Sequence, residues 1–162
     1  MRPDRENLLA ELRQSASLRG QRVSTLQAAA DTLRRAGGYR WVGLYDVDHA
    51  QGEVRNIVYS GPGAPEFPTF PISKGLTGSA ISNRQTVNVG DVAADPRYLT
   101  AFGSTRSEII VPIFDRGRNQ VVGTIDVESE APNAFDENTQ HILEACAEAL
   151  APLWESPENS RS

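Results

Sequence analysis

The stretch that decides the fold covers residues 107–129 and reads S-E-I-I-V-P-I-F-D-R-G-R-N-Q-V-V-G-T-I-D-V-E-S. It contains two apolar runs, 109–114 and 121–127, which are separated by a polar connection with a glycine. β-Branched residues dominate both runs, and this composition predicts a hairpin of two buried antiparallel strands.

Acidic residues lie at the ends of these two predicted strands. Glu108 opens the first strand, and Asp126 and Glu128 lie two residues apart near the end of the second. Because side chains alternate along a strand, Asp126 and Glu128 share one face. Glu108 joins them if paired positions sum to an even number, whereas an odd sum places it on the other face. Three carboxylates that close together repel one another, so the arrangement requires either a face open to water or a bound cation.

The composition is that of an ordinary globular protein with one domain. The chain has 162 residues, of which 39% are hydrophobic and 23% charged, and this length is enough to bury a core. The net charge of −5 argues against a nucleic-acid partner, which would need a basic face. No stretch resembles a signal peptide or approaches the length of a membrane span. The single cysteine, Cys146, excludes an internal disulfide and a cysteine-based metal site, and it suggests a reducing cytoplasm.

The periodicity predicts helices and strands in an order typical of an α+β fold. The predicted helices cover residues 4–18, 23–35, 74–84 and 136–154, and a single helical turn is expected at 95–99. The predicted strands cover residues 39–47, 54–59, 86–89, 109–114 and 121–127. A loop with four prolines, 61–71, is expected to be irregular. Since most strands are joined by hairpins or short connections, we expect an antiparallel sheet with helices packed on it.

The terminal segments are expected to have separate roles. Residues 1–22 form an N-terminal helix whose leucine stripe, Leu8 and Leu12, packs either on its own domain or on the helix of a partner. We favour the partner, and therefore a homodimer. The second helix carries its own stripe of Val23, Leu26, Ala30 and Leu33. Residues 23–155 form the folded domain, and the polar residues 156–162 are expected to be disordered.

Four sequence segments resemble those of GAF domains. They are K-G-L-T-G-S-A at 74–80, V-N-V-G-D-V at 87–92, S-E-I-I-V-P-I at 107–113 and V-V-G-T-I-D-V-E-S at 121–129. The resemblance covers about residues 23–154. It implies a six-stranded antiparallel sheet, with helices from both termini on one face and a ligand pocket on the other. It also implies a cytoplasmic ligand sensor that pairs through its terminal helices.

Within that family, R-W-V-G-L-Y at 40–45 and G-D-V at 90–92 are similar to segments of the free methionine-(R)-sulfoxide reductases. The resemblance implies that two aromatic side chains form one wall of a substrate cage and that three acids hold the ammonium group of the substrate. A fourth acid lines the same cavity. The implied ligand-binding residues are Trp41, Tyr45, Asp91, Glu108, Asp126 and Glu128, with Glu128 at a position where an aspartate is usual.

The chain departs from that enzyme pattern where sulfur chemistry is required. The reductase uses one cysteine as nucleophile and a second to form a disulfide. The corresponding positions here hold Ala101 and Thr77. Cys146 lies on the apolar stripe of the last helix, where a buried thiol is inert. We therefore expect no catalytic residue and no cofactor. His49 and His141 have no second imidazole or thiol at ligand spacing, so we expect no metal site either.

Three functions follow as alternatives. The leading one is a non-catalytic sensor whose pocket binds an ammonium-bearing ligand, such as a free amino acid or methionine sulfoxide, with no membrane or nucleic-acid partner. The second is a sulfoxide reductase that uses an unrecognised reductant or Cys146. The third is an interaction module whose pocket is filled by its own side chains. In the simplest structural alternative, the acids are hydrated on an open sheet face, the aromatic side chains are core residues and Thr77 caps or packs a helix.

Overall fold

The structure is a computed structural model that describes residues 4–16, 21–99 and 103–155. Within these ranges its helices are α1 (Arg5–Ala16), α2 (Arg22–Gly37), α3 (Gly75–Asn83) and α4 (Glu137–Leu150), with short 3-10 turns at Val92–Ala94 and Ala151–Trp154. Its strands are β1 (Trp41–Asp48), β2 (Glu53–Ser60), β3 (Thr69–Pro71), β4 (Val87–Val89), β5 (Ser107–Phe114) and β6 (Val121–Ser129).

The six strands form one antiparallel sheet in the order β3-β2-β1-β6-β5-β4. The predicted hairpin is β5–β6, and β6 also pairs with β1, so the first strand lies beside the last. The predicted α+β class and antiparallel sheet are therefore confirmed.

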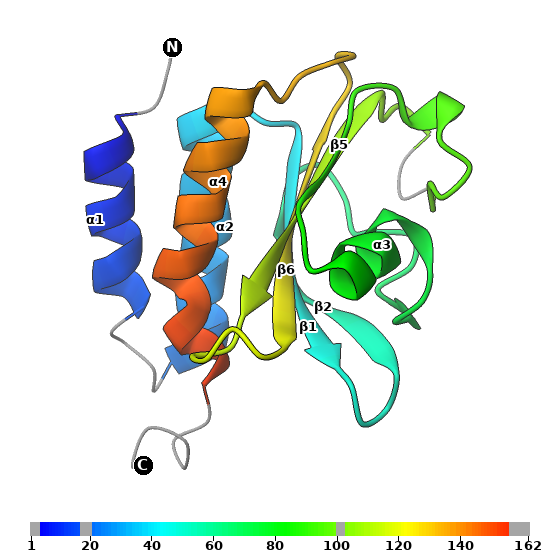
Figure 1. The fold of residues 1–162 in the computed structure, drawn as a ribbon. Coiled ribbons are helices and arrows are strands. Elements are labelled where there is room, and N and C mark those ends of the chain that lie inside the picture. The colour runs from blue at the N-terminus through cyan, green and yellow to red at the C-terminus, as the bar shows by residue number, and fades with distance from the viewer. Residues whose placement is uncertain (1–3, 17–20, 100–102, 156–162) are drawn as a thin grey trace.

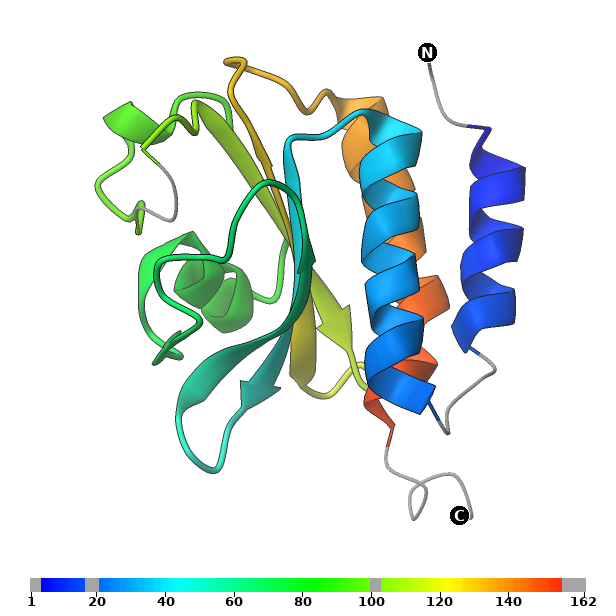
Figure 2. The same cartoon turned by 180° about the vertical axis from the view of Figure 1, so that it is seen from behind.

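The helices divide unequally between the two faces of the sheet. Helices α1, α2 and α4 lie on one side, with α2 and α4 next to the strands, and α3 lies on the other side (Figure 1; Figure 2 shows the reverse view). The main core fills the space between the sheet and the three helices, and includes Leu26, Leu33, Ile125, Val127 and Leu143. This arrangement leaves the α3 side of the sheet, with its loops, for a pocket.

Helix α1 is covered within its own chain. Leu8, Leu9 and Leu12 are buried in the main core, where α1 contacts α2 and α4. A partner's helix is therefore not needed to cover this stripe, which corrects our preference for pairing through it. The homodimer itself stays a prediction. On α2, Val23 is 60% exposed and does not belong to the buried stripe.

The proline-rich loop contains a strand that the sequence did not predict. Phe70 in β3 pairs with Val54, and Pro71 pairs with Glu53. β3 is an edge strand, so its proline does not need to donate a hydrogen bond on the solvent side. The single turn expected at 95–99 is present as a hydrogen-bonded turn in which Tyr98 N donates to Asp95 O at 3.2 Å, and an unpredicted 3-10 turn at Val92–Ala94 precedes it.

The last helix begins and ends near its predicted limits. The Asp136 side chain accepts a hydrogen bond from Thr139 N at 2.8 Å and so caps α4. Pro152 falls in the 3-10 turn that follows Leu150, as expected for a residue that cannot continue a helix. No helix among the described residues is both long and apolar enough to span a bilayer.

Candidate functional site

The strand register brings the three acids to one face. Glu108 pairs with Glu128, and Ile110 pairs with Asp126, so the paired positions sum to an even number. The odd-numbered neighbours Ile109 and Val127 point into the core under the helices. The carboxylates therefore lie on the α3 face, where the resemblance placed a ligand pocket.

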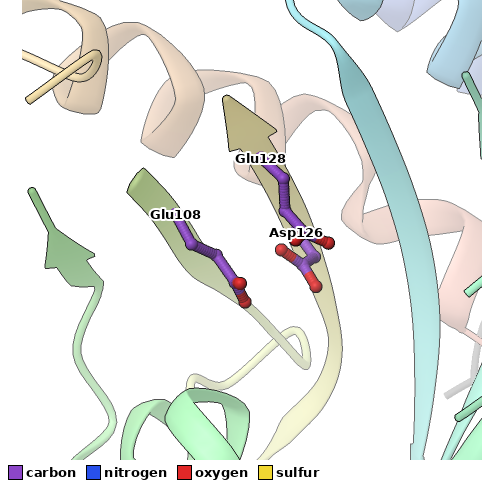
Figure 3. Close-up of side chains that lie close together, drawn as sticks. All are labelled: Glu108, Asp126 and Glu128. Atoms are coloured by element: carbon purple, nitrogen blue, oxygen red, sulfur yellow. The ribbon is translucent and has the colours of Figure 1, made fainter. Parts of the chain in front are cut away.

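The three carboxylates form a buried cluster, which we call the acid cluster. Glu108 is 5% exposed, Asp126 6% and Glu128 0%, so the alternative of a hydrated sheet face is wrong. One carboxylate oxygen from each residue lies within 4.8 Å of the other two, and Figure 3 shows the side chains converging. Glu108 Oε2, Asp126 Oδ1 and Glu128 Oε2 are buried without a hydrogen-bond partner. Because a buried acceptor without a donor costs free energy, a bound hydrogen-bond donor or cation would stabilise these oxygens.

Glu128 is the acid whose ionised form is stabilised by neighbouring groups of the protein. Thr105 Oγ1 donates a hydrogen bond to Glu128 Oε1 at 2.7 Å. Burial raises the pKa of Glu128 to about 7, while the Thr105 hydrogen bond and the charge of Arg40 act in the opposite direction.

The ionised forms of Glu108 and Asp126 are less well stabilised than that of Glu128. Burial, followed by the charges of Asp126 and Glu128, raises the pKa of Glu108 well above its usual range. Burial and the Glu128 charge also raise the pKa of Asp126, and a hydrogen bond from Glu108 partly opposes this. Without a bound cation, the three acids therefore take up protons more readily than exposed carboxylates do.

Aromatic side chains stand beside the acid cluster. Trp41 pairs with Glu128, and Gly43 pairs with Asp126, so Trp41 and Tyr45 lie on the same face as the acids. The Trp41 indole stacks on Tyr59 with ring centroids 6.2 Å apart, and it donates from Nε1 to Gly63 O at 3.0 Å. Trp41 is 0% exposed and Tyr45 3%, so the two rings are packed as well as positioned.

A small cavity adjoins two of the acids. Its volume is about 30 Å³, which is close to that of one water molecule. The lining combines carboxylates with apolar and aromatic side chains: Tyr45, Pro65, Phe67, Phe70, Gly75, Leu76, Thr77, Leu99, Glu108 and Asp126. Several of these residues come from loops, so a ligand larger than water requires the loops to move. A larger cleft of about 710 Å³ lies between β5 and α4, and none of the predicted site residues line it.

Three of the six predicted positions, Trp41, Asp91 and Glu128, do not line the cavity. Asp91 is exposed, and its Oδ1 accepts a hydrogen bond from Ala93 N at 3.2 Å, so it caps the 3-10 turn. The expectation that Asp91 lines the cavity is wrong for this reason. Trp41 donates a hydrogen bond to the loop carbonyl of Gly63 and packs beside the cavity-lining Tyr45, with ring centroids 6.5 Å apart.

Of the two positions that hold cysteine in the reductases, the structure describes only Thr77. Thr77 lies inside α3, is buried and lines the cavity beside Glu108 and Asp126. It does not form the N-terminal cap of α3, where Lys74 stands. Ala101 lies outside the described residues.

Cys146 is on the opposite side of the sheet from the acid cluster. It is 0% exposed, lies in the core under the helices, and burial raises the pKa of its thiol to about 12. A protonated thiol behind the sheet is not a nucleophile for a ligand on the α3 face.

Sequence reasoning missed two threonines in this region. Thr124 pairs with Tyr45 and lies on the cluster's face, with its buried hydroxyl oxygen unpartnered. Its two-residue spacing from Asp126 could have predicted that it lies on the same face of the strand. Thr105 precedes β5 in a loop, and no periodic pattern shows that such a residue turns back to Glu128.

Comparisons with known proteins agree with this fold. The model of the GAF domain family matches residues 21–152. The chain is 28% identical over 138 residues to GAF domain-containing protein A of Dictyostelium discoideum, covering 85% of this chain and 84% of that protein. It is 30% identical over 112 residues to the free methionine-R-sulfoxide reductase of Saccharomyces cerevisiae, covering 68% of this chain and 60% of the enzyme.

A solved structure covers nearly the whole chain. The free methionine-R-sulfoxide reductase of Neisseria meningitidis, solved in complex with its substrate, superimposes with a TM-score of 0.85 and 31% identity, covering 96% of this chain and 91% of that one. With a matching family model, the six-stranded antiparallel sheet and relatives of this kind, the chain belongs to the GAF domain family.

Proposed function

We propose that the acid cluster binds the ammonium group of a free amino acid of the methionine sulfoxide type. The observation that carries this proposal is the convergence of three buried carboxylates, each with an unpartnered oxygen, on the face opposite the helical layer. An ammonium group has three N–H donors and a positive charge, so it satisfies three such acceptors at once.

The surroundings suit the remainder of such a ligand. Apolar and aromatic side chains, including Phe67, Phe70 and Leu99, line the cavity beyond the carboxylates and provide contacts for an uncharged side chain. The cavity of about 30 Å³ is too small for an amino acid, so binding includes an outward movement of the loops that carry Phe67 and Leu99. The similarity to reductases solved with their substrate supports this choice of ligand class.

Calorimetry with free methionine sulfoxide tests the proposal. We expect Glu108→Gln and Asp126→Asn each to weaken binding by about 2–5 kcal/mol, because each removes a charge that pairs with the buried ammonium. Glu148→Gln on the exposed surface of α4 is the matched control and should leave the affinity unchanged. Equal affinities in the wild type and both cluster variants would reject the proposal.

Two functions could use such a site, a sensor and a reductase, and the similarity to named reductases supports the second at least as well as the first. In the first, the domain only binds and reports the amino acid, as a sensor. Cys146 supports this version, because it is the sole cysteine and lies behind the sheet.

In the second, the domain reduces the sulfoxide, as its relatives' names indicate for them. The sulfoxide accepts two electrons and two protons to give methionine and water, and an external dithiol supplies both and becomes a disulfide. Thiol-dependent loss of methionine sulfoxide, followed by chromatography, separates the two versions. Turnover equal to that in buffer leaves the sensor, and turnover abolished by Asp126→Asn establishes the reductase.

A further inference from the structure

We propose that the acid cluster also binds a calcium-sized divalent cation when the pocket is closed, and that this cation and the amino acid exclude each other. The first part stands on the geometry of the empty pocket, and only the mutual exclusion rests on the proposed function.

The charge of the cluster exceeds what one ammonium group can balance. Glu108, Asp126 and Glu128 together carry three negative charges when ionised, whereas an ammonium group supplies one positive charge. The charge of Arg40 stabilises ionised Glu128, although Arg40 itself forms an ion pair with Glu130 at 2.5 Å. A divalent cation balances two of the three charges without a proton.

The spacing of the oxygens fits a particular size of ion. Calcium binds oxygen at about 2.3–2.6 Å, so two oxygens on the same ion are at most about 4.6–5.2 Å apart. The three carboxylate oxygens lie within 4.8 Å of one another, a bound that falls inside the limit for the longer calcium–oxygen bonds. Magnesium binds at about 2.0–2.1 Å, keeps several of its waters and therefore needs both a tighter set of oxygens and more space.

The buried oxygens and the cavity are two independent indications of a ligand here. Each acid has a buried oxygen without a hydrogen-bond donor, and Figure 3 shows the three side chains converging. The adjoining cavity of about 30 Å³ holds one water or one bare ion, but not an amino acid. The closed pocket therefore has the donor atoms and the space for a cation, while the amino acid requires the open pocket.

Calcium chloride alone is the probe, added at about pH 8 to the full chain after treatment with a chelator, so that the carboxylates are ionised. We expect one calcium per chain with a dissociation constant between about 10 µM and 1 mM, and a rise in Tm. Glu108→Gln and Asp126→Asn should each weaken binding at least about tenfold. Glu148→Gln should bind like the wild type.

The outcomes separate this inference from the proposed function. No saturable heat together with no rise in Tm up to about 10 mM calcium overturns the cation site. Equal calcium binding by wild type and both cluster variants also overturns it, because the ion then lies elsewhere. If calcium binds and free methionine sulfoxide does not, the proposed function fails and the cation site stands. If both bind, calcium must raise the apparent Kd of the amino acid, and simultaneous binding refutes the exclusion.

Discussion

Thr105 is the residue that sets how readily Glu128 ionises. Its hydroxyl donates to Glu128 Oε1 at 2.7 Å, and this hydrogen bond lowers the pKa of Glu128. Thr105→Val removes the donor, so the pKa of Glu128 should rise, and the ammonium ligand should reach half of its full affinity at a pH about one unit higher.

Calorimetry from pH 6 to 9 measures this shift. Thr105→Ser keeps the hydroxyl and should show the wild-type midpoint in the pH dependence of affinity. If Thr105 acted only by packing, the hydroxyl would not matter for this midpoint. A midpoint unchanged in Thr105→Val would contradict the role given to this hydrogen bond.

Gly43 leaves room for the aromatic side chains. A Cβ atom at this position would overlap the Trp41 indole and come within 2.9 Å of Tyr45 Cε1. We expect Gly43→Ala to lower the free energy of unfolding by about 1–3 kcal/mol and to weaken the ligand, because both rings must move. Gly63→Ala is the control, since a Cβ there meets no atom within 4 Å. Chemical denaturation and calorimetry of both variants provide the comparison, and wild-type behaviour of Gly43→Ala would argue against a packed aromatic wall.

At this scale the sequence predicts the site in part. The two-residue spacing of Asp126 and Glu128 is enough to place them on one face, and strand periodicity is robust. The position of Glu108 depended on the register, which alternation alone leaves open between even and odd. Asp91 was placed wrongly because a capping carboxylate and a cavity-lining carboxylate look the same in a sequence.

Helix α4 carries Cys146 on the side of the sheet away from the acid cluster. If the thiol is only a core group, Cys146→Ala should lower stability by about 1–2 kcal/mol and leave ligand affinity unchanged. It should also leave any thiol-dependent loss of methionine sulfoxide unchanged. Denaturation, calorimetry and chromatography test these three expectations. Loss of turnover with retained binding would show that Cys146 takes part in the chemistry.

The elements themselves were largely predictable, and the exceptions have physical reasons. The hairpin β5–β6 and the cap of α4 follow from local patterns, which residues 107–129 and Asp136 contain. Strand β3 was missed because prolines normally exclude a central strand, and only the completed sheet shows that β3 is an edge. The leucine stripe of α1 was predicted, but the stripe alone does not specify which surface covers it, and in the structure α1 contacts α2 and α4 of its own chain.

For the whole molecule, three buried acids predict a stability that depends on pH. Burial raises the pKa of Glu128 from 4.5 to about 7, and raises those of Glu108 and Asp126 as well. An acid with a raised folded-state pKa contributes its stability fully below the unfolded-state pKa and loses it as pH rises through the folded-state value. The free energy of unfolding without ligand should therefore fall between about pH 5 and 8, on the order of 3 kcal/mol for Glu128 alone.

Denaturation at a series of pH values measures this fall. The double variant Glu108→Gln/Asp126→Asn should flatten the profile, because the neutral amides remove two of the three acids whose pKa burial raises. Glu148→Gln should retain the wild-type slope. A wild-type profile with no fall over this range would contradict the burial of the three acids.

The central claim is that the acid cluster, on the face away from α1, α2 and α4, holds the ammonium group of a free amino acid. A crystal structure of the protein with bound methionine sulfoxide tests it most directly. The account predicts the ammonium nitrogen at about 3 Å from carboxylate oxygens of Glu108, Asp126 and Glu128, with the loops of Phe67 and Leu99 moved outward. An amino acid bound in the cleft between β5 and α4, or an ammonium group turned away from these carboxylates, would contradict it.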